Sequence, residues 1–307
     1  MMSGSKAMVA VITGPTASGK SAMAMQLATM LGGTIINADA SQLYADLRII
    51  SARPSAADEA AVPHLLYGVL DGDSVANAAS WAALAKAAIA DVQATGRVPI
   101  LVGGSGMYLT TLIEGIAPVP DIDADVRAAV RALETPAAAA ALAVEDPAVA
   151  AQLRPSDRQR VLRALEVVRG TGRSLQHWQA TRTGGIAAEF DVRRLVVEVP
   201  RPVLHARAAA RLEQMVAAGA LAEVAALLAR GLPADRPVLR ALGVAEFGAV
   251  LAGTMTLDAA LAAAAAATRQ YQKRQATWAR SQAADWARID GSVNDLEAKL
   301  SDIFILS

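Results

Sequence analysis

The stretch that decides the fold is Gly14-Pro15-Thr16-Ala17-Ser18-Gly19-Lys20-Ser21, which fits the pattern G-x-x-x-x-G-K-S/T of a phosphate-binding loop. An apolar run at 9–13 predicts a buried strand before it, and the pattern after it predicts a helix. Glycines let the backbone turn its N–H groups towards a phosphate at the start of that helix. Lys20 adds a positive charge, and the Ser21 hydroxyl can hold Mg²⁺. All eight residues are therefore expected to bind the phosphates of a nucleotide or of another diphosphate.

Two further strands are predicted downstream, at 34–38 and 99–102, each followed by a loop. Asp39 follows the first of these strands, and a Gly103-Gly104-Ser105-Gly106 turn follows the second. Strands that alternate with helices form parallel sheets, which bind ligands at the carboxyl ends of the strands. The phosphate-binding loop, Asp39 and Ser105 are thus expected at one edge of the sheet. On its spacing alone, Asp39 could be a general base, a Mg²⁺ ligand or a helix cap.

The strand pattern is interrupted between about 120 and 185, where only helices are predicted, among them 155–169 with Ser156 as its N-cap. A strand pattern returns at 194–199, and helices follow it. We therefore predict an α/β fold, in which a parallel sheet with a P-loop is flanked by helices and carries an all-helical insertion domain. The predicted core comprises 1–120 and 186–307, and the predicted insertion comprises 121–185.

The composition excludes several classes of protein. Of the 307 residues, 54% are hydrophobic and 19% are charged, which suits a large core and does not suit a disordered chain. No apolar run reaches the roughly 18 residues that a membrane span needs. The absence of cysteine excludes disulfides, zinc–thiolate sites and a cysteine nucleophile. Because the chain starts without a secretory signal pattern, we expect a cytoplasmic protein. We also expect a monomer that does not associate with a membrane.

The net charge of +0 hides an uneven distribution. Residues 1–150 contain 8 Lys and Arg against 14 Asp and Glu, whereas 151–307 contain 21 against 15. Within 154–211, twelve arginines stand against five acidic residues. Arginine makes planar, two-pronged contacts with phosphate, so this region indicates either a polyanionic partner or a solvated helical surface. A second basic stripe along one helix face could follow a phosphate backbone and consists of Arg269, Lys273 and Arg280.

Six further segments make the sequence similar to bacterial tRNA dimethylallyltransferases. They follow the order of that family between about residues 8 and 282 and are Asn37-Ala38-Asp39-Ala40-Ser41-Gln42-Leu43-Tyr44, Ala52-Arg53-Pro54, Val62-Pro63-His64-Leu65-Leu66, Val102-Gly103-Gly104-Ser105-Gly106-Met107-Tyr108-Leu109, Asp157-Arg158-Gln159-Arg160-Val161-Leu162-Arg163-Ala164-Leu165-Glu166-Val167 and Lys273-Arg274-Gln275-Ala276-Thr277-Trp278-Ala279-Arg280. The resemblance implies transfer of a dimethylallyl group from dimethylallyl diphosphate to N6 of adenosine 37 of tRNA, beside the anticodon. It also implies Mg²⁺ as the cofactor.

The resemblance implies roles for individual residues as well. Asp39 would be the general base that takes the proton from N6, while Thr16 and Arg211 would contact the diphosphate. Contacts with tRNA are implied for Asp39, Ala40, Ser41, Gln42, Ser105, Arg127, Gln159, Arg160, Val161, Leu162, Arg163, Lys273, Arg274 and Arg280. Without the resemblance, the favoured interpretation of Gln159, Arg160 and Arg163 is a solvated helix face, and Trp278 is expected to pack in the core.

Two segments depart from the family pattern. Ile50-Ser51-Ala52-Arg53-Pro54 stands where the family has Gly-Thr-Ala-Lys-Pro. Leu242-Gly243-Val244-Ala245-Glu246 lacks the aromatic and basic residues of many members, which leaves its contact with tRNA open. Three other classes of protein could use such a phosphate-binding loop: an adenylate prenyltransferase of the cytokinin-forming type, a small-molecule kinase, and a nucleotide-switched RNA-binding protein. The basic helices argue against the first, and the third leaves Asp39 and Arg211 without a role.

Overall fold

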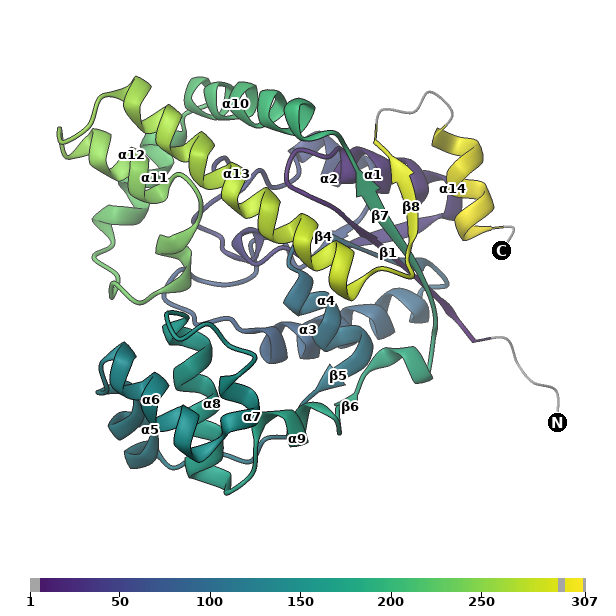
Figure 1. Cartoon of the computed structure of the whole chain (residues 1–307). Coiled ribbons are helices and arrows are strands. Elements are labelled where there is room, and N and C mark those ends of the chain that lie inside the picture. Colours follow the sequence, from purple (N-terminus) through teal and green to yellow (C-terminus); the bar gives the residue numbers. More distant parts are fainter. Residues whose placement is uncertain (1–5, 292–295, 306–307) are drawn as a thin grey trace, which may run out of the picture. The chain divides into compact units, whose positions relative to one another are not determined.

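The computed structural model describes residues 6–291 and 296–305 (Figure 1). The chain divides into two compact units, of which the first is formed by Met1–Ile113 and Ile186–Ser307 and the second by Glu114–Gly185. We call them the core unit and the helical unit. Each unit buries hydrophobic clusters of its own, so each is described separately.

The core unit is built on a six-stranded sheet in the order β3-β2-β4-β1-β7-β8, and all of its strand pairs are parallel. The strands are β1 (Met8–Thr13), β2 (Gly33–Asn37), β3 (His64–Leu65), β4 (Val98–Gly103), β7 (Asp191–Glu198) and β8 (Ala287–Asp290). In the central strand β1, Thr13 lies opposite Gly103 of β4 and Val196 of β7. The phosphate-binding loop therefore leaves the sheet between the carboxyl ends of two neighbouring strands. The predicted α/β fold class is confirmed.

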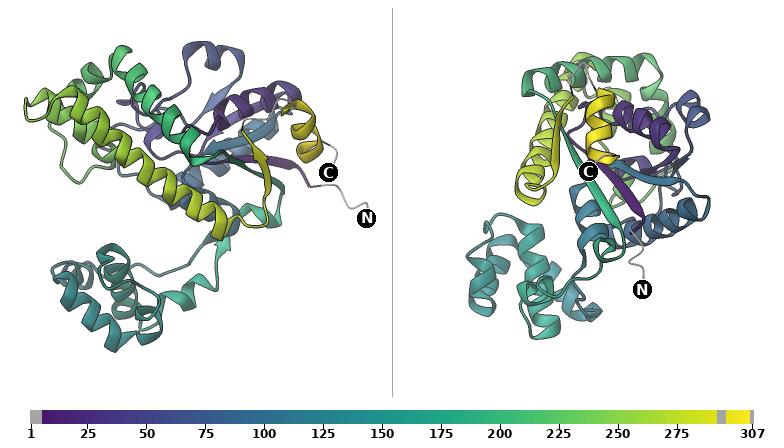
Figure 2. Two further views of the ribbon diagram at one scale, coloured as in Figure 1. Left: turned by 45° about the horizontal axis from the view of Figure 1, so that its top comes forward. Right: turned by 90° about the vertical axis from the view of Figure 1, so that its right-hand side faces the viewer.

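Successive residues of β1 point to opposite faces of the sheet. Val9 and Val11 pack with α3 (Ala78–Ala94) and α4 (Gly106–Glu114), whereas Ala10 and Ile12 pack with α1 (Lys20–Leu31) and α14 (Leu296–Phe304). Figure 2 shows α1 and α14 side by side. Because both faces of the sheet are buried, its strands read as continuous apolar runs rather than as alternating patterns.

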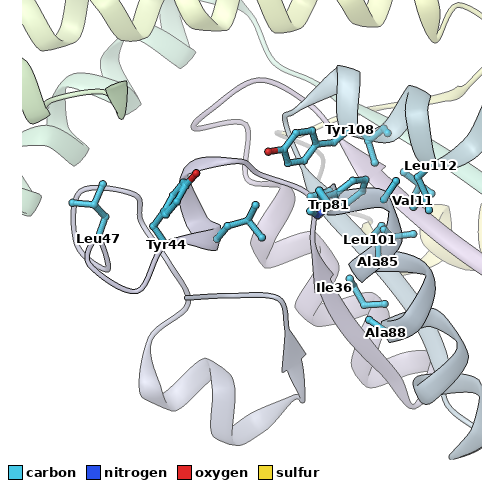
Figure 3. Packing of buried hydrophobic residues seen from close by; sticks show 14 of the residues in the cluster. Val11, Ile36, Tyr44, Leu47, Trp81, Ala85, Ala88, Leu101, Tyr108 and Leu112 are labelled. Atoms are coloured by element: carbon cyan, nitrogen blue, oxygen red, sulfur yellow. The ribbon is translucent and has the colours of Figure 1, made fainter. Parts of the chain in front are cut away.

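Trp81 of α3 is one of the buried core residues that pack together in Figure 3. Its side chain is fully buried, and its ring stacks on that of Tyr108 from α4, with centroids 4.9 Å apart. The indole Nε1 donates a hydrogen bond to the carbonyl oxygen of Asn37, at 2.9 Å. Trp81 thus ties α3 and α4 to the end of β2, two residues before Asp39.

The remaining helices of the core unit are α2 (Ala56–Ala61), α10 (Arg201–Ala217), α11 (Ala220–Ala229), α12 (Val244–Leu251) and α13 (Leu257–Gln282). The longest, α13, begins at the N-cap Thr256, whose hydroxyl accepts a hydrogen bond from the Ala259 N–H. Within the described residues, no single helix is long and apolar enough to cross a membrane, and only the bent pair α10 and α11 passes that test of length and composition.

The helical unit contains α5 (Ala124–Arg131), α6 (Thr135–Glu145), α7 (Pro147–Ala150), α8 (Arg158–Thr171) and α9 (Leu175–Gln179). Its chain enters and leaves through a short antiparallel pair, β5 (Gly115–Ile116) with β6 (Thr183–Gly184), so the unit begins at Glu114. The predicted N-cap of α8 is wrong by one residue. The carboxylate of Asp157, rather than the Ser156 hydroxyl, accepts the hydrogen bond from the Arg160 N–H.

Two strands of the core sheet have no counterpart among the predicted strands. Strand β3 has only two residues, both half-buried, which is too short for a recognisable pattern. In β8 only Ile289 is buried, while its three other residues are exposed. Both strands lie at the edges of the sheet, where a long apolar run is not required.

Candidate active site

The phosphate-binding loop joins β1 to α1 in a tightly turned conformation. Ala17 and Gly19 have positive φ angles of 68° and 91°, which turn the backbone into the start of the helix. A Cβ on Gly14 would lie 2.7 Å from the carbonyl oxygen of Val197, so only glycine fits there. Gly19 caps α1 without a side-chain hydrogen bond, which leaves the first N–H groups of the helix for a ligand.

A cavity of about 330 Å³ opens beside this loop and will be called the central cavity. From the loop it is lined by Thr16, Lys20 and Ser21. Ser18 is fully buried, and its hydroxyl has no hydrogen-bond partner among the described residues. Pro15 borders a second, larger groove instead. Of the eight predicted phosphate-binding residues, three line the central cavity.

Two cations and one carboxylate face one another in the central cavity. Lys20 comes from the loop, Arg211 from α10, and Asp39 from the turn after β2. The pKa of Lys20 is lowered to about 8, mainly by burial; Asp39 acts in the opposite direction, and the neighbouring Arg211 adds to the lowering. Burial also lowers the pKa of Arg211, again against the effect of Asp39. The site is thus rich in positive charge that a bound anion would stabilise.

Asp39 is held in place by hydrogen bonds on both sides. The buried Asn37 amide accepts from the Asp39 N–H at 2.8 Å and donates to the Asp39 carbonyl oxygen at 3.0 Å. Ser41 donates to Asp39 Oδ1 from its backbone N–H, at 3.1 Å, and from its hydroxyl, at 2.7 Å. Within the described part of the chain, Asp39 Oδ2 has no hydrogen-bond partner. One carboxylate oxygen is therefore fixed, and the other is left for a proton donor.

Ser105 and Gln42 hold the turn around Asp39. The Ser105 hydroxyl accepts a hydrogen bond from the Ala40 N–H at 3.0 Å. Gln42 donates from Nε2 to the carbonyl oxygens of Ser51 and Ala52, at 3.0 and 2.8 Å. The structure therefore brings the phosphate-binding loop, Asp39 and Ser105 together at the predicted edge of the sheet. The side chains of Ser105 and Gln42 form hydrogen bonds with backbone groups of neighbouring loops.

All four tyrosines of the chain line the central cavity, and the sequence analysis singled out none of them. They are Tyr44, Tyr67, Tyr108 and Tyr271. Burial raises the pKa of Tyr108 to about 12 and also raises the pKa of Tyr67 and of Tyr271. Their phenols therefore stay neutral, and together the four residues give the central cavity an aromatic wall. Two of them, Tyr44 and Tyr108, lie inside segments that carry the family resemblance.

The two segments that differ from the family pattern, 50–54 and 242–246, also border the central cavity. Ile50, Ser51 and Ala52 line it from one segment, and Leu242 lines it from the other. Arg53 lies beneath Gly68, where a Cβ would come within 2.1 Å of the guanidinium. These segments thus help to shape the cavity wall, which their sequences did not reveal.

The basic stripe of α13 lies beside a groove of about 860 Å³, separate from the central cavity. Arg269, Lys273 and Arg280 line this groove and are exposed. Arg274, for which a tRNA contact is implied, lines the central cavity, with its guanidinium carbon 5.3 Å from the centre of the Tyr271 ring. Trp278 packs against the core, as predicted, and donates from Nε1 to the Thr110 hydroxyl.

In the helical unit, the predicted contact residues of α8 differ in their environments. Gln159 and Arg160 are exposed, and Arg160 makes a loose ion pair with Asp157, at 3.5 Å. Arg163 is half-exposed and lies 3.7 Å from the buried Glu166. Val161 is buried in the small core of this unit, because the helix needs that position for packing, so its side chain is not presented to a partner.

The other predicted residues of this unit are also partly enclosed. Leu162 is half-buried against the same small core. Arg127 of α5 is half-buried, and its Nε finds no hydrogen-bond partner in residues 6–291 and 296–305. A buried guanidinium N–H without a partner is costly, so Arg127 retains a donor that an anion could satisfy.

Comparisons with known proteins agree with one another. The family model of IPP transferase matches residues 42–282. A tRNA dimethylallyltransferase of Sphingopyxis alaskensis is 58% identical over 282 residues, covering 91% of this chain and 92% of the relative. The enzyme of the same name from Zymomonas mobilis is 48% identical and covers 93% of this chain and 92% of its own.

Solved structures give the same result. A tRNA isopentenylpyrophosphate transferase from Bacillus halodurans matches with a TM-score of 0.70 and 31% identity, covering 97% of this chain and 94% of the other. A eukaryotic dimethylallyltransferase acting on tRNA matches with a TM-score of 0.81 and 25% identity, covering 97% of this chain and 76% of the other.

Proposed function

Because the chain belongs to the IPP transferase family, we propose that it transfers a dimethylallyl group from dimethylallyl diphosphate to N6 of adenosine 37 in tRNA, releasing diphosphate. One observation carries this proposal. The central cavity is lined by two cations, Lys20 and Arg211, and by the carboxylate of Asp39, one oxygen of which makes no hydrogen bond within the described residues. Leaving-group stabilisation and proton removal are the two tasks of this reaction.

The donor would be held by the loop. Its diphosphate would accept hydrogen bonds from the N–H groups at the start of α1 and would pair with Lys20 and Arg211, while Thr16 lines the same cavity. As the bond from C1 of the dimethylallyl group to the diphosphate oxygen breaks, negative charge grows on the diphosphate. Groups that are already oriented towards that charge stabilise the transition state more than the ground state.

The residues of this site would bind Mg²⁺ only together with a bound diphosphate. Throughout residues 6–291 and 296–305, no group of three or more His, Cys, Asp or Glu could hold a metal ion. The Ser21 hydroxyl lies at the cavity, so Ser21 would hold Mg²⁺ jointly with oxygens of the diphosphate. When bound, the ion would neutralise part of the charge on the leaving group.

The pH dependence of diphosphate binding is expected to follow Lys20. Below about pH 8 its ammonium is charged and attracts the anion, whereas above this value an increasing fraction is neutral. Affinity should therefore fall as pH rises from 8 to 9.5, with Lys20 contributing up to about tenfold per pH unit. Calorimetry with inorganic diphosphate and Mg²⁺ measures this. Since diphosphate itself titrates, Lys20→Met supplies the baseline, and an identical slope in both proteins would contradict the assignment.

The acceptor would reach the same cavity as an extruded base. Adenosine in a stacked anticodon loop must leave the stack before its N6 can approach Asp39. The aromatic wall suits a flat purine and an apolar prenyl group. As the bond from N6 to C1 forms, Asp39 Oδ2 takes the N6 proton, while Ser41 keeps Oδ1 in place. The prenyl group thus replaces one hydrogen on N6.

The remaining basic residues suit the tRNA backbone. Arg160, Arg163 and Arg127 of the helical unit and Lys273, Arg274 and Arg280 of α13 offer guanidinium and ammonium groups to phosphates. We include Gln159 and Ser105 as contacts to tRNA by their polar side chains. Val161 and Leu162 keep only their backbone for this purpose. We further propose that the protein acts in the cytoplasm as a monomer.

Removing Arg160 is expected to weaken tRNA binding and to flatten its salt dependence. Each phosphate contact adds about 0.7 to 0.9 to the slope of log affinity against log salt concentration, so Arg160→Ala should reduce that slope by nearly one. Arg163→Ala should do the same to a smaller extent, because Arg163 also pairs with Glu166. Binding of tRNA measured across a salt series tests this.

Arg169→Ala is the matched control for these variants. It removes the same charge from α8, but Arg169 is engaged by Glu145 through three hydrogen bonds. Its salt slope should match that of the unmodified protein. An unchanged slope in Arg160→Ala would indicate that these residues form a solvated helix face and do not contact phosphates.

The acceptor class separates the main proposal from its rivals. Purified protein is incubated with Mg²⁺ and labelled dimethylallyl diphosphate, with unmodified tRNA, AMP or ATP in parallel arms. We expect label in tRNA alone. Label in AMP or ATP would identify an adenylate prenyltransferase, and consumption of ATP without transfer would identify a kinase or a nucleotide-driven switch.

A further inference from the structure

Gln275 of α13 bridges two segments of the site without lining the central cavity itself. Its side-chain Oε1 accepts a hydrogen bond from the Thr16 N–H, at 2.8 Å, and its Nε2 donates to the carbonyl oxygen of Gly104, at 3.1 Å. Only 7% of the residue is exposed. Because one end of the amide faces a donor and the other an acceptor, its orientation is fixed.

The bridge requires glycine at position 104. A Cβ there would lie 2.0 Å from Gln275 Nε2, so any side chain would push the amide away. One turn earlier on α13, Gln272 donates from Nε2 to the carbonyl oxygen of Thr16, at 2.8 Å. Both backbone groups of Thr16 are therefore held by buried glutamines of a single helix.

These bonds decide what Thr16 can offer to a ligand. Its N–H is already used by Gln275, so the backbone at this position does not serve the phosphates. Thr16 nevertheless lines the central cavity, which leaves its hydroxyl as the group available there. The direction of that hydroxyl depends on the backbone, and the backbone depends on Gln275.

We propose that Gln275 is a positioning residue, which sets the Thr16 hydroxyl towards the leaving diphosphate by bridging the phosphate-binding loop to Gly104. The inference rests on the proposed function, in which Thr16 contacts the diphosphate. Gln275 acts through Thr16 and does not touch the substrate. It lies on the same helix as the exposed residues Lys273 and Arg280, but its own burial excludes a surface role.

A double-mutant cycle tests this dependence. Single-turnover transfer to tRNA is measured for the unmodified protein, Thr16→Ala, Gln275→Met and the double variant. Methionine keeps the volume of glutamine and removes both hydrogen bonds. Gln275→Met should slow transfer by about 10²-fold, a typical cost of misplacing a reacting group. In the Thr16→Ala background the same change should slow transfer by less than about threefold, because the hydroxyl it positions is gone.

Gly104→Ala provides a second route to the same result. It leaves Gln275 unchanged but displaces its amide, so it should slow transfer similarly and add little to Gln275→Met. Gln282→Met is the matched control, because this glutamine is exposed on the same helix and should leave transfer unchanged. Circular dichroism checks that each variant is folded.

The outcomes separate the inference from the function on which it rests. Effects that multiply in the double variant, or full activity in Gln275→Met, would overturn the positioning role while transfer to tRNA stands. If the unmodified protein transfers nothing to tRNA, the proposed function fails. The affinity for inorganic diphosphate then tests the positioning role of Gln275. Gln275→Met should weaken that binding about tenfold relative to Gln282→Met, because the loop is released. Equal affinities would overturn the inference.

Discussion

Asp39→Asn is expected to lower the rate of transfer to tRNA by about 10² to 10⁴-fold, which is the usual contribution of a general base. The side chain of asparagine has the same shape, and its Oδ1 can still accept both hydrogen bonds from Ser41. The turn therefore stays in place, and only the ability to take the N6 proton is lost. Single-turnover kinetics at saturating donor and tRNA measure the effect.

Binding of the donor gives an internal check on this variant. Asp39 is an anion in the cavity that receives the diphosphate, so removing its charge should leave diphosphate affinity unchanged or higher. Asp285→Asn serves as the control, because this carboxylate is exposed and makes only a 3.9 Å ion pair with Arg194. Transfer at the normal rate in Asp39→Asn would remove Asp39 from the role of base.

Lys20→Met is expected to lower the transfer rate by about 10² to 10³-fold, comparable to the loss of one preorganised donor to a developing negative charge. Lys20 is half-buried near Arg211, in surroundings that depress its pKa to about 8. Such a site disfavours an ammonium until an anion arrives. Its interaction should thus be strongest when the charge on the leaving diphosphate is greatest, which lowers kcat as well as kcat/KM.

The kinetic pattern decides whether Lys20 has this role. Lys299→Met, on the exposed face of α14, should behave like the unmodified protein. If Lys20→Met raises KM for the donor while kcat is unchanged, Lys20 contributes only to ground-state binding, and another group must stabilise the leaving diphosphate.

Much of the fold was predictable from local sequence. The apolar runs of β1, β2, β4 and β7 are buried on both faces, so each stands out against its loops. The phosphate-binding loop was readable because its glycines are required by backbone geometry, as at Gly14 and Gly19. The position of Asp39 at the site was predictable because it follows a parallel strand, whereas its role as general base was implied by the family resemblance.

Other features depend on contacts between distant segments and left no local pattern. Gln275 meets Thr16 across 259 residues of sequence, and nothing in the pattern of α13 separates it from an exposed glutamine. The four tyrosines come from four separate segments, so their shared cavity emerges only on folding. Val161 was placed among tRNA contacts because a family segment includes it, whereas helix periodicity sends its side chain into the core.

The most direct test of the central claim compares two tRNAs that differ at one position. One is an unmodified tRNA with adenosine at position 37, and the other is the same tRNA with guanosine there. With labelled dimethylallyl diphosphate and Mg²⁺, we expect label in the first tRNA, located on N6 of that adenosine by nuclease digestion and mass spectrometry, and none in the second. Equal labelling of both tRNAs, or label in neither, would contradict the proposed function.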